Sequence, residues 1–345
     1  MKLARIANAL AMALFSGAAL AQTLPDSAVL VTPDNFIRAE SDLYMGNAVR
    51  DAGGIGKFVH HRMPVEIDKQ FVIRANRDTL YSVAVFDLDA GPVTVTMPDA
   101  GGRFMSMMVL NEDHYAQDVF YGAGAHTLTK DDIGTRYVVV AIRTLVDPNN
   151  AKDVDAAHKL QDLIQVSQKD PGKFEVPNWD PTSQKKVRDA LLALGATANG
   201  FKHAFGRKDE VDPVYHLIGT AMGWGGNPEK AAIYLAETPA KNDGATIYRL
   251  NVKNVPVDAF WSISVYNADG YFVKNPYDAY SLNNIIAKKS ADGSVEIQFG
   301  GCDGKIPNCL PTMPGWNYTV RLYRPRVEIL NGTWKFPEAQ PQNGP

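Results

Sequence analysis

The chain has 345 residues, a formal net charge of −3 and only two cysteines. No long basic or acidic run is present, so the sequence lacks the electrostatic pattern expected of a nucleic-acid-binding protein. The length exceeds what one hydrophobic core usually holds, and we therefore expect two or three domains.

The first 21 residues have the pattern of a secretory signal peptide. Lys2 and Arg5 precede an apolar stretch, and Ala19-Leu20-Ala21 fits a cleavage site. The apolar stretch, of roughly 15 residues, is short for a membrane span. We expect cleavage near Ala21, export to the periplasm or out of the cell, and no transmembrane segment in the mature chain. Loss of Lys2 and Arg5 would change the net charge to −5.

The next part of the chain predicts one helix followed by strands. Thr32 is the expected helix cap with Pro33 at the first helical position, and Gly53-Gly54 ends the helix. Strands are predicted from β-branched, aromatic and apolar patterns, and we expect the first three to be neighbours in a meander. The predicted strands are 79–88, 93–97, 104–110 and 137–145.

The pattern becomes helical after 147 and returns to strands from 245. Helices are predicted at 154–164, from a cap at Thr182 to Gly195, and from Asn227 through Leu235. The later strands are predicted at 245–252, 259–266, 271–275, 294–299, 317–323 and 327–330.

These patterns predict a mainly β protein with a helical middle region. The expected organisation is a signal peptide (1–21), a helix and β-sandwich domain (22–146), a mainly helical region (147–240), a jelly-roll or other sandwich domain (241–336) and a loose tail (337–345).

Polar side chains gather where the predicted strands begin. Arg77 and Asp78 precede the strand at 79–88, and Arg103 precedes the one at 104–110. A meander would bring the three together, either as a structural ion pair or as a catalytic group. In the second case, Asp78 acts as a general acid or base if burial raises its pKa, and Arg77 or Arg103 holds an anionic group of the substrate.

Aromatic residues of the C-terminal region complete the expected site, as they are suited to lining a small-molecule cleft, although they also suit an ordinary sandwich core. Within 259–266, alternation places Trp261 and Ile263 on one face and Ser262 and Ser264 on the other, and such a polar face is normally solvated. The candidate ligand-binding residues are Asn76, Tyr81, His114, Trp261, Tyr266 and Tyr280.

Cys302 and Cys309 are expected to form a local disulfide in an oxidising compartment. The alternative, a metal bound by two thiolates, lacks a nearby His or Cys to complete it. His114, beside Glu112 and Asp113, is the best single ligand candidate, but no metal-binding spacing occurs, so we predict no metal. No nucleotide, flavin or haem motif is present, and we predict no cofactor.

Several runs resemble known families. Asn76-x-Asp78-Thr79-x-Tyr81, followed by Asp87-Leu88-x-x-Gly91-Pro92, resembles the family called domain of unknown function 1254. Phe260-Trp261-Ser262-Ile263 and the later Arg321-Leu322-Tyr323-x-Pro325 resemble its usual companion, domain of unknown function 1214. The resemblance covers nearly the whole mature chain. It implies an immunoglobulin-like N-terminal sandwich, a helical middle and a C-terminal jelly roll. At Cys309 the sequence departs from the pattern, which commonly has Trp there, so a pocket lined by that Trp in relatives would differ here.

Together these observations predict an exported protein that acts on a small organic molecule, or binds one, between the two β domains. For an enzyme, we expect hydrolytic or acid/base chemistry. The alternative is a non-catalytic envelope protein that binds a glycan or a protein partner through the jelly roll. The sequence leaves open whether copies associate into a homo-oligomer.

Overall fold

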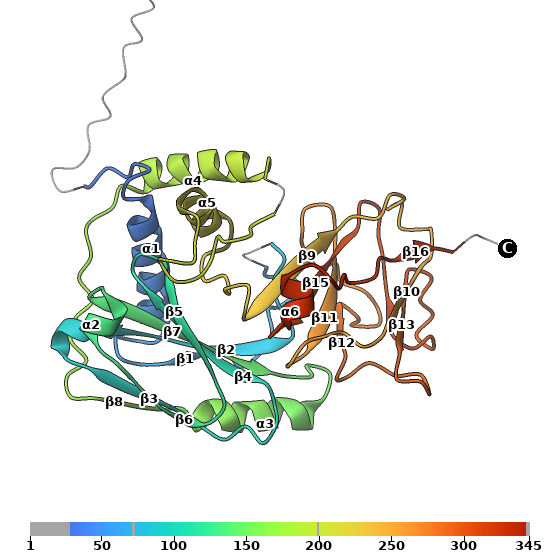
Figure 1. Ribbon diagram of the computed structural model, residues 1–345, viewed down its shortest axis with the longest axis horizontal. Coiled ribbons are helices and arrows are strands. Elements are labelled where there is room, and N and C mark those ends of the chain that lie inside the picture. Colours follow the sequence, from blue (N-terminus) through green and yellow to red (C-terminus); the bar gives the residue numbers. More distant parts are fainter. Residues whose placement is uncertain (1–27, 71–72, 199, 343–345) are drawn as a thin grey trace, which may run out of the picture.

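The computed structural model describes residues 28–70, 73–198 and 200–342, and the predicted signal peptide at 1–21 lies outside this range. The described part is mainly β, with 16 strands and six α-helices (Figure 1). Within these residues, no helix combines the length and the hydropathy needed to cross a membrane. The mainly β fold class predicted from the sequence is confirmed.

The N-terminal unit packs a five-stranded sheet against a three-stranded sheet. The first has the order β1 (Val59–His60), β2 (Thr79–Asp87), β7 (Tyr137–Leu145), β4 (Met105–Asn111) and β5 (Ala116–Tyr121). The second has the order β6 (Gly124–Leu128), β3 (Val93–Met97) and β8 (Gln165–Gln168). Apolar side chains of β2, β4, β7 and β3 fill the space between the two sheets.

The four strands predicted in this unit are confirmed, but the predicted meander is wrong. β7 lies between β2 and β4 and pairs antiparallel with both, whereas β3 belongs to the other sheet. The turn at Gly91-Pro92 takes the chain out of the first sheet, because proline has no N–H with which to continue a ladder. Since β2 and β4 are both antiparallel to β7, the first residues of β2 and β4 lie beside the last residues of β7, at one end of the strands.

Three helices form a layer on the outer side of the five-stranded sheet (Figure 1). They are α1 (Phe36–Asp51), α4 (Pro181–Gly195) and α5 (Pro213–Gly223). Two predicted caps are wrong: α1 follows Asn35 rather than Thr32, and Asp180 rather than Thr182 caps α4, because its carboxylate accepts the Ser183 N–H. The helix α3 (Ala151–Asp162) is confirmed, with the Asn150 side chain as its cap. A short α2 (Lys130–Ile133) precedes β7.

The C-terminal unit also consists of two sheets that face each other across an apolar core. One has the order β14 (Cys309–Leu310), β13 (Val295–Phe299), β10 (Tyr248–Val252) and β16 (Gln340–Pro341). The other has the order β12 (Ser281–Asn283), β11 (Trp261–Tyr266), β15 (Asn317–Tyr323) and β9 (Ala232–Glu237).

Four sequence predictions fail in or next to this unit. The expected helix through Leu235 is instead β9, which pairs with β15 over six residue pairs, so tertiary pairing overrides a short helical pattern. The run 271–275 forms no strand, and 327–330 forms the helix α6 (Val327–Leu330). The predicted tail is not loose up to residue 342, because β16 pairs with β10.

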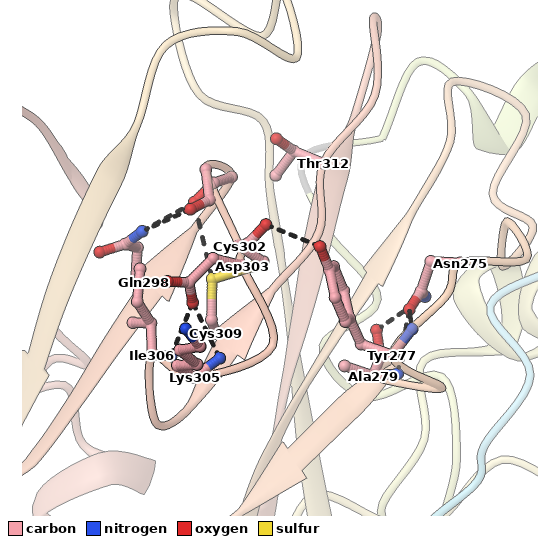
Figure 2. The surroundings of a disulfide bond; sticks show 12 residues. Asn275, Tyr277, Ala279, Gln298, Cys302, Asp303, Lys305, Ile306, Cys309 and Thr312 are labelled. Atoms are coloured by element: carbon pink, nitrogen blue, oxygen red, sulfur yellow. Dashed lines mark hydrogen bonds between the residues drawn. A yellow bond between two sulfur atoms is a disulfide. The ribbon is translucent and has the colours of Figure 1, made fainter.

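The predicted disulfide between Cys302 and Cys309 is confirmed (Figure 2). The loop that it closes is further ordered by the Asp303 carboxylate, which accepts the N–H groups of Lys305 and Ile306 at 2.8 and 2.9 Å. Tyr277 Oη donates to the Cys302 carbonyl at 3.0 Å. The loop is thus attached both to β14 and to the segment before β12.

We predict that replacing both Cys302 and Cys309 by Ala lowers the free energy of unfolding by about 2–2.5 kcal/mol, because the bond restricts a short loop in the unfolded chain. Urea denaturation without reductant measures the difference. The wild type unfolded with reductant is the control and should match the variant. Equal stability of the variant and the oxidised wild type would contradict the prediction.

Candidate functional site

Two adjoining cavities lie between the N-terminal and C-terminal units. The smaller, of about 10 Å³, has room for roughly one water molecule and is lined by polar groups that include Arg77 and Asp78. The larger, of about 220 Å³, lies against the disulfide loop. Asn149, Ser281 and Ile286 line both cavities, so the two form one cleft.

Asp78 lies at the closed end of this cleft, with only 2% of its surface exposed. Its carboxylate accepts a hydrogen bond from Ser262 Oγ of β11 at 2.6 Å, which joins the two units directly. Its backbone N–H donates to Asn76 Oδ1, and its carbonyl accepts the Val146 N–H beyond the end of β7. The position of the carboxyl group is therefore fixed from both units.

Burial raises the pKa of Asp78 above its ordinary value, because a charged carboxylate is disfavoured away from water. The positive charge of Arg321 and the hydrogen bonds from Ser262 and Asn283 act in the opposite direction without cancelling the effect of burial. Asp78 therefore keeps its proton to a higher pH than an exposed carboxyl does, which is the property required of a general acid.

Arg321 of β15 is the second charged group buried between the units. Its guanidinium donates to Ser264 Oγ at 2.8 Å, to Tyr266 Oη at 2.7 Å and to the Arg74 carbonyl at 2.9 Å. Burial disfavours its charge, but Tyr266, Tyr323 and Asp78 outweigh this effect and raise the pKa of Arg321. Arg321 thus remains a cation whose donors are used to hold the interface.

The face of β11 that carries Ser262 and Ser264 is fully buried, which corrects the expectation that it is solvated. Alternation along the strand is as predicted: Trp261 and Ile263 belong to the apolar core of the C-terminal unit. The polar face instead packs against the residues that lead into β2, whose carbonyl groups and side chains satisfy its donors. A polar strand face can be buried when each group finds a partner.

Arg77 lines the small cavity and is placed to meet a ligand. Its Nη1 donates to the Val65 carbonyl, and its guanidinium lies over the Tyr280 ring at 5.2 Å from the centroid. Burial lowers its pKa, although Tyr280 and Asp278 act against the shift. Within the described residues, Arg77 forms no ion pair with a carboxylate, so its charge is available to an anion in the cleft.

Arg103 has a different partner from the one expected. Its guanidinium forms a two-point ion pair with Asp153 of α3, at 2.9 and 2.6 Å, and also donates to the Leu145 carbonyl. Arg103 therefore contacts Leu145, and Asp78 contacts Val146, the next residue after β7. This agrees with the strand order, in which β2 and β4 begin where β7 ends. Arg103 is not among the residues that line the cleft, and its contacts hold α3 against the sheet.

Two more predicted ligand residues, Asn76 and Tyr81, do not line the cleft either. Asn76 Nδ2 donates to Tyr81 Oη at 3.2 Å and to Tyr323 Oη at 2.9 Å. Tyr81 also lies next to Arg143, whose guanidinium is 5.3 Å from the ring centroid. These residues form a separate cluster where the five-stranded sheet meets β9 and β15.

His114 is buried and connects β4 to α5. Its Nε2 accepts the Gly225 N–H at 2.8 Å, so its proton lies on Nδ1, which donates to Thr220 Oγ1 at 2.9 Å. Burial, together with His216, lowers the pKa of His114 to about 3. His114 is therefore neutral at physiological pH. Within the described residues, no group of three or more His, Cys, Asp or Glu side chains is placed to hold a metal ion.

Of the three C-terminal aromatic residues predicted to bind a ligand, only Tyr280 lines the cleft. Trp261 lies in the apolar core, where it contacts Phe336. Tyr266 is fully buried and donates to the Ala75 carbonyl. Sequence reasoning missed Asn149, Ser281, Asn283 and Arg321. A signal did exist for Arg321, because it is the one charged residue in the strand pattern 317–323.

The fold and the cleft define a two-unit, mainly β protein with a helical layer. Its sequence matches the family model DUF1254 at residues 55–132 and the family model DUF1214 at residues 231–327, both described as proteins of unknown function. The chain therefore belongs to the proteins that carry these two segments in this order, as the resemblance implied. No curated protein matches the chain.

Two solved structures share the fold. The VPA0106 protein from Vibrio parahaemolyticus is 18% identical, with a TM-score of 0.69, and the alignment covers 90% of this chain and 98% of that one. An uncharacterized protein from Burkholderia cenocepacia is 13% identical, with a TM-score of 0.50, and the alignment covers 84% and 83%. At these identities the likeness concerns the fold alone.

We predict that Asp78→Asn changes how stability depends on pH. The folded state binds the Asp78 proton more tightly than the unfolded state, whose pKa lies near 3.8. This contribution to stability is complete below pH 3.8 and is lost as the pH rises through the folded pKa. The asparagine variant lacks this loss, so its stability relative to wild type should increase with pH above about 4.

Urea denaturation of both proteins at several pH values between 4 and 8 provides the measurement. Groups that titrate equally in the two proteins, such as Asp42, whose pKa burial raises to about 6, cancel in the comparison. A stability difference that stays constant over this range would contradict the assignment of a raised pKa to Asp78.

Proposed function

We propose that this protein binds a small organic molecule that carries an anionic group, in the cleft between the two β units. The observation that supports this most is the continuity of the two cavities, one polar and one larger. Small-molecule sites commonly combine apolar surface with a few fixed polar groups at one end.

The chemistry of the lining gives the ligand an orientation. The anionic group lies near Arg77, which stacks on Tyr280 and has no carboxylate partner among the described residues. The apolar body extends into the larger cavity, where Leu282, Ile306 and Leu310 provide apolar surface. A compact organic acid, such as a short fatty acid, fits this division of polar and apolar surface.

The same geometry suits acid/base chemistry on the bound molecule. Asp78 is held by Ser262 and Asn283, retains its proton through burial, and borders a space for about one water. In the enzymatic form of the proposal, Asp78 donates a proton to the ligand or accepts one from it. Arg77 then positions the ligand's anionic group.

We further propose that the protein is exported and acts in the periplasm or outside the cell. The signal-like pattern before Gln22 and the disulfide between Cys302 and Cys309 support this compartment.

Calorimetric titration with hexanoate and hexanamide tests the binding proposal, because the two molecules match in size and differ in charge. We expect saturable binding of hexanoate and at least roughly tenfold weaker binding of hexanamide, since a charge-assisted pair with Arg77 is lost. Arg77→Gln should remove the preference. Arg50→Gln is the matched control, because Arg50 lies on the exposed surface of α1 beside Asn47.

Absence of saturable binding, or an Arg77→Gln variant that binds as the wild type does, would contradict the proposal. The enzymatic form is tested by screening ester, amide and glycoside panels with wild type and Asp78→Asn. A flat response in both experiments, combined with retention on polysaccharide, would favour the glycan-binding alternative.

A further inference from the structure

A row of polar side chains crosses the five-stranded sheet at a distance from the cleft. In the strand pairing, Tyr81 of β2 faces Arg143 of β7, Arg143 faces Ser106 of β4, and Ser106 faces Tyr121 of β5. Directly paired residues point to the same side of a sheet. The four side chains therefore lie side by side on one face, where the helical layer ends at Gly225 and the C-terminal unit begins.

The C-terminal unit contributes residues to the same place. Tyr323, at the end of β15, shares the Asn76 amide with Tyr81. Arg324, the next residue, lies over the Tyr121 ring, with its guanidinium 4.7 Å from the centroid. Tyr234 of β9 belongs to the same cluster, because its hydroxyl acts electrostatically on both Arg143 and Tyr323.

The charges of this cluster are unbalanced. Within the described residues, neither Arg143 nor Arg324 forms an ion pair with a carboxylate. Asp258 acts on Arg324 at longer range, but its own ion pair is with Arg326. Arg143 thus lies within the row and Arg324 lies over Tyr121 at one end of it, and neither cation has a carboxylate as an ion-pair partner among the described residues.

Arg143 carries the clearest sign of a missing partner. It is 6% exposed, and its Nη2 donates to the Gly225 carbonyl at 3.2 Å. Its Nη1 is buried and has no hydrogen-bond partner of good geometry among the described residues, although the guanidinium also interacts with the Tyr81 hydroxyl. A buried donor on a charged group costs free energy when it is left without an acceptor, so it calls for an explanation such as an ordered water or a bound ligand.

One phenol, Tyr81, responds to this charge. Burial alone would raise the pKa of Tyr81, but Arg143, Asn76 and Thr79 outweigh burial and lower it. Burial, together with Tyr234 and Tyr81, raises the pKa of Tyr323. The field around Arg143 therefore favours negative charge beside its guanidinium, as the lowered pKa of Tyr81 indicates.

Tyr234 offers a route to solvent. It is 44% exposed, and its hydroxyl is held by Asn227 Nδ2 at 2.7 Å.

We propose that this row is a second ligand site, in which an oxyanion (a carboxylate or a phosphate) binds between Arg143 and Arg324. The oxyanion accepts a hydrogen bond from Nη1 of Arg143. Nearby phenol hydroxyls supply further donors, and Tyr121 contributes an aromatic surface. The site is separate from the cleft that contains Arg77, so either can be tested without the other.

Calorimetric titration of the mature protein with inorganic phosphate, and separately with acetate, tests the site at constant ionic strength. We expect saturable binding of at least one of the two ions. The ion that binds shows whether the site takes a phosphate or a carboxylate. Arg143→Gln and Arg324→Gln should each weaken that binding by at least about tenfold, through loss of a charge-assisted contact. Arg324→Gln keeps the test decisive if Arg143→Gln does not fold, because the Arg324 side chain is only partly buried.

Two further variants serve as controls. Arg326→Gln removes an exposed arginine two residues away and should bind as the wild type does. Arg77→Gln should also leave this binding unchanged, which distinguishes the row from the cleft. Absence of saturable binding of either ion would overturn the proposal, as would equal binding by Arg324→Gln and wild type, or loss of binding only in Arg77→Gln.

Discussion

The burial of a polar sheet face between the two β units is the constraint on which the rest of the structure depends. Ser262, Ser264 and Arg321 point out of the C-terminal sandwich, and the segment leading into β2 covers them. Burying these groups is favourable only if each one is paired, and the N-terminal unit supplies the Asp78 carboxylate and the carbonyls of Arg74 and Ala75 as partners. The relative position of the units is therefore specified by hydrogen bonds and not by apolar area alone.

This constraint also separates the polar residues at the start of β2 into two groups. Arg77 and Asp78 lie at the cleft, whereas Asn76 and Tyr81 contact Tyr323 and Arg143 on the other side. One short segment thus contributes to a cavity on one side and to a buried tyrosine–arginine row on the other. A substitution at Asn76 or at Asp78 is expected to affect both the cleft and the tyrosine–arginine row, because each of these residues contacts the C-terminal unit.

Most of the strand content could be predicted from the sequence, because β2, β3 and β7 have alternating or wholly apolar patterns that few other structures accommodate. The errors occur where tertiary pairing decides. Ala232–Glu237 becomes a strand because β15 offers it an edge, and 327–330 becomes a helical turn despite its β-branched residues. Arg103 was expected beside Asp78, but α3 brings Asp153 closer, and a sequence pattern cannot reveal that choice. The buried role of Arg321 likewise depends on residues 74–78, which are remote in sequence.

A double-mutant cycle between Asp78 and Ser262 tests this account most directly. Asp78→Ala, Ser262→Ala and the double variant are unfolded in urea, and the coupling free energy is calculated from the four stabilities. The account predicts a coupling of about 1–3 kcal/mol, because the two groups form one buried hydrogen bond across the units. Thr94→Ala, which removes an exposed contact between Thr94 of β3 and Thr127 of β6, provides the control and should be additive with Asp78→Ala. Additive effects of Asp78→Ala and Ser262→Ala would contradict the claim that this interaction joins the units.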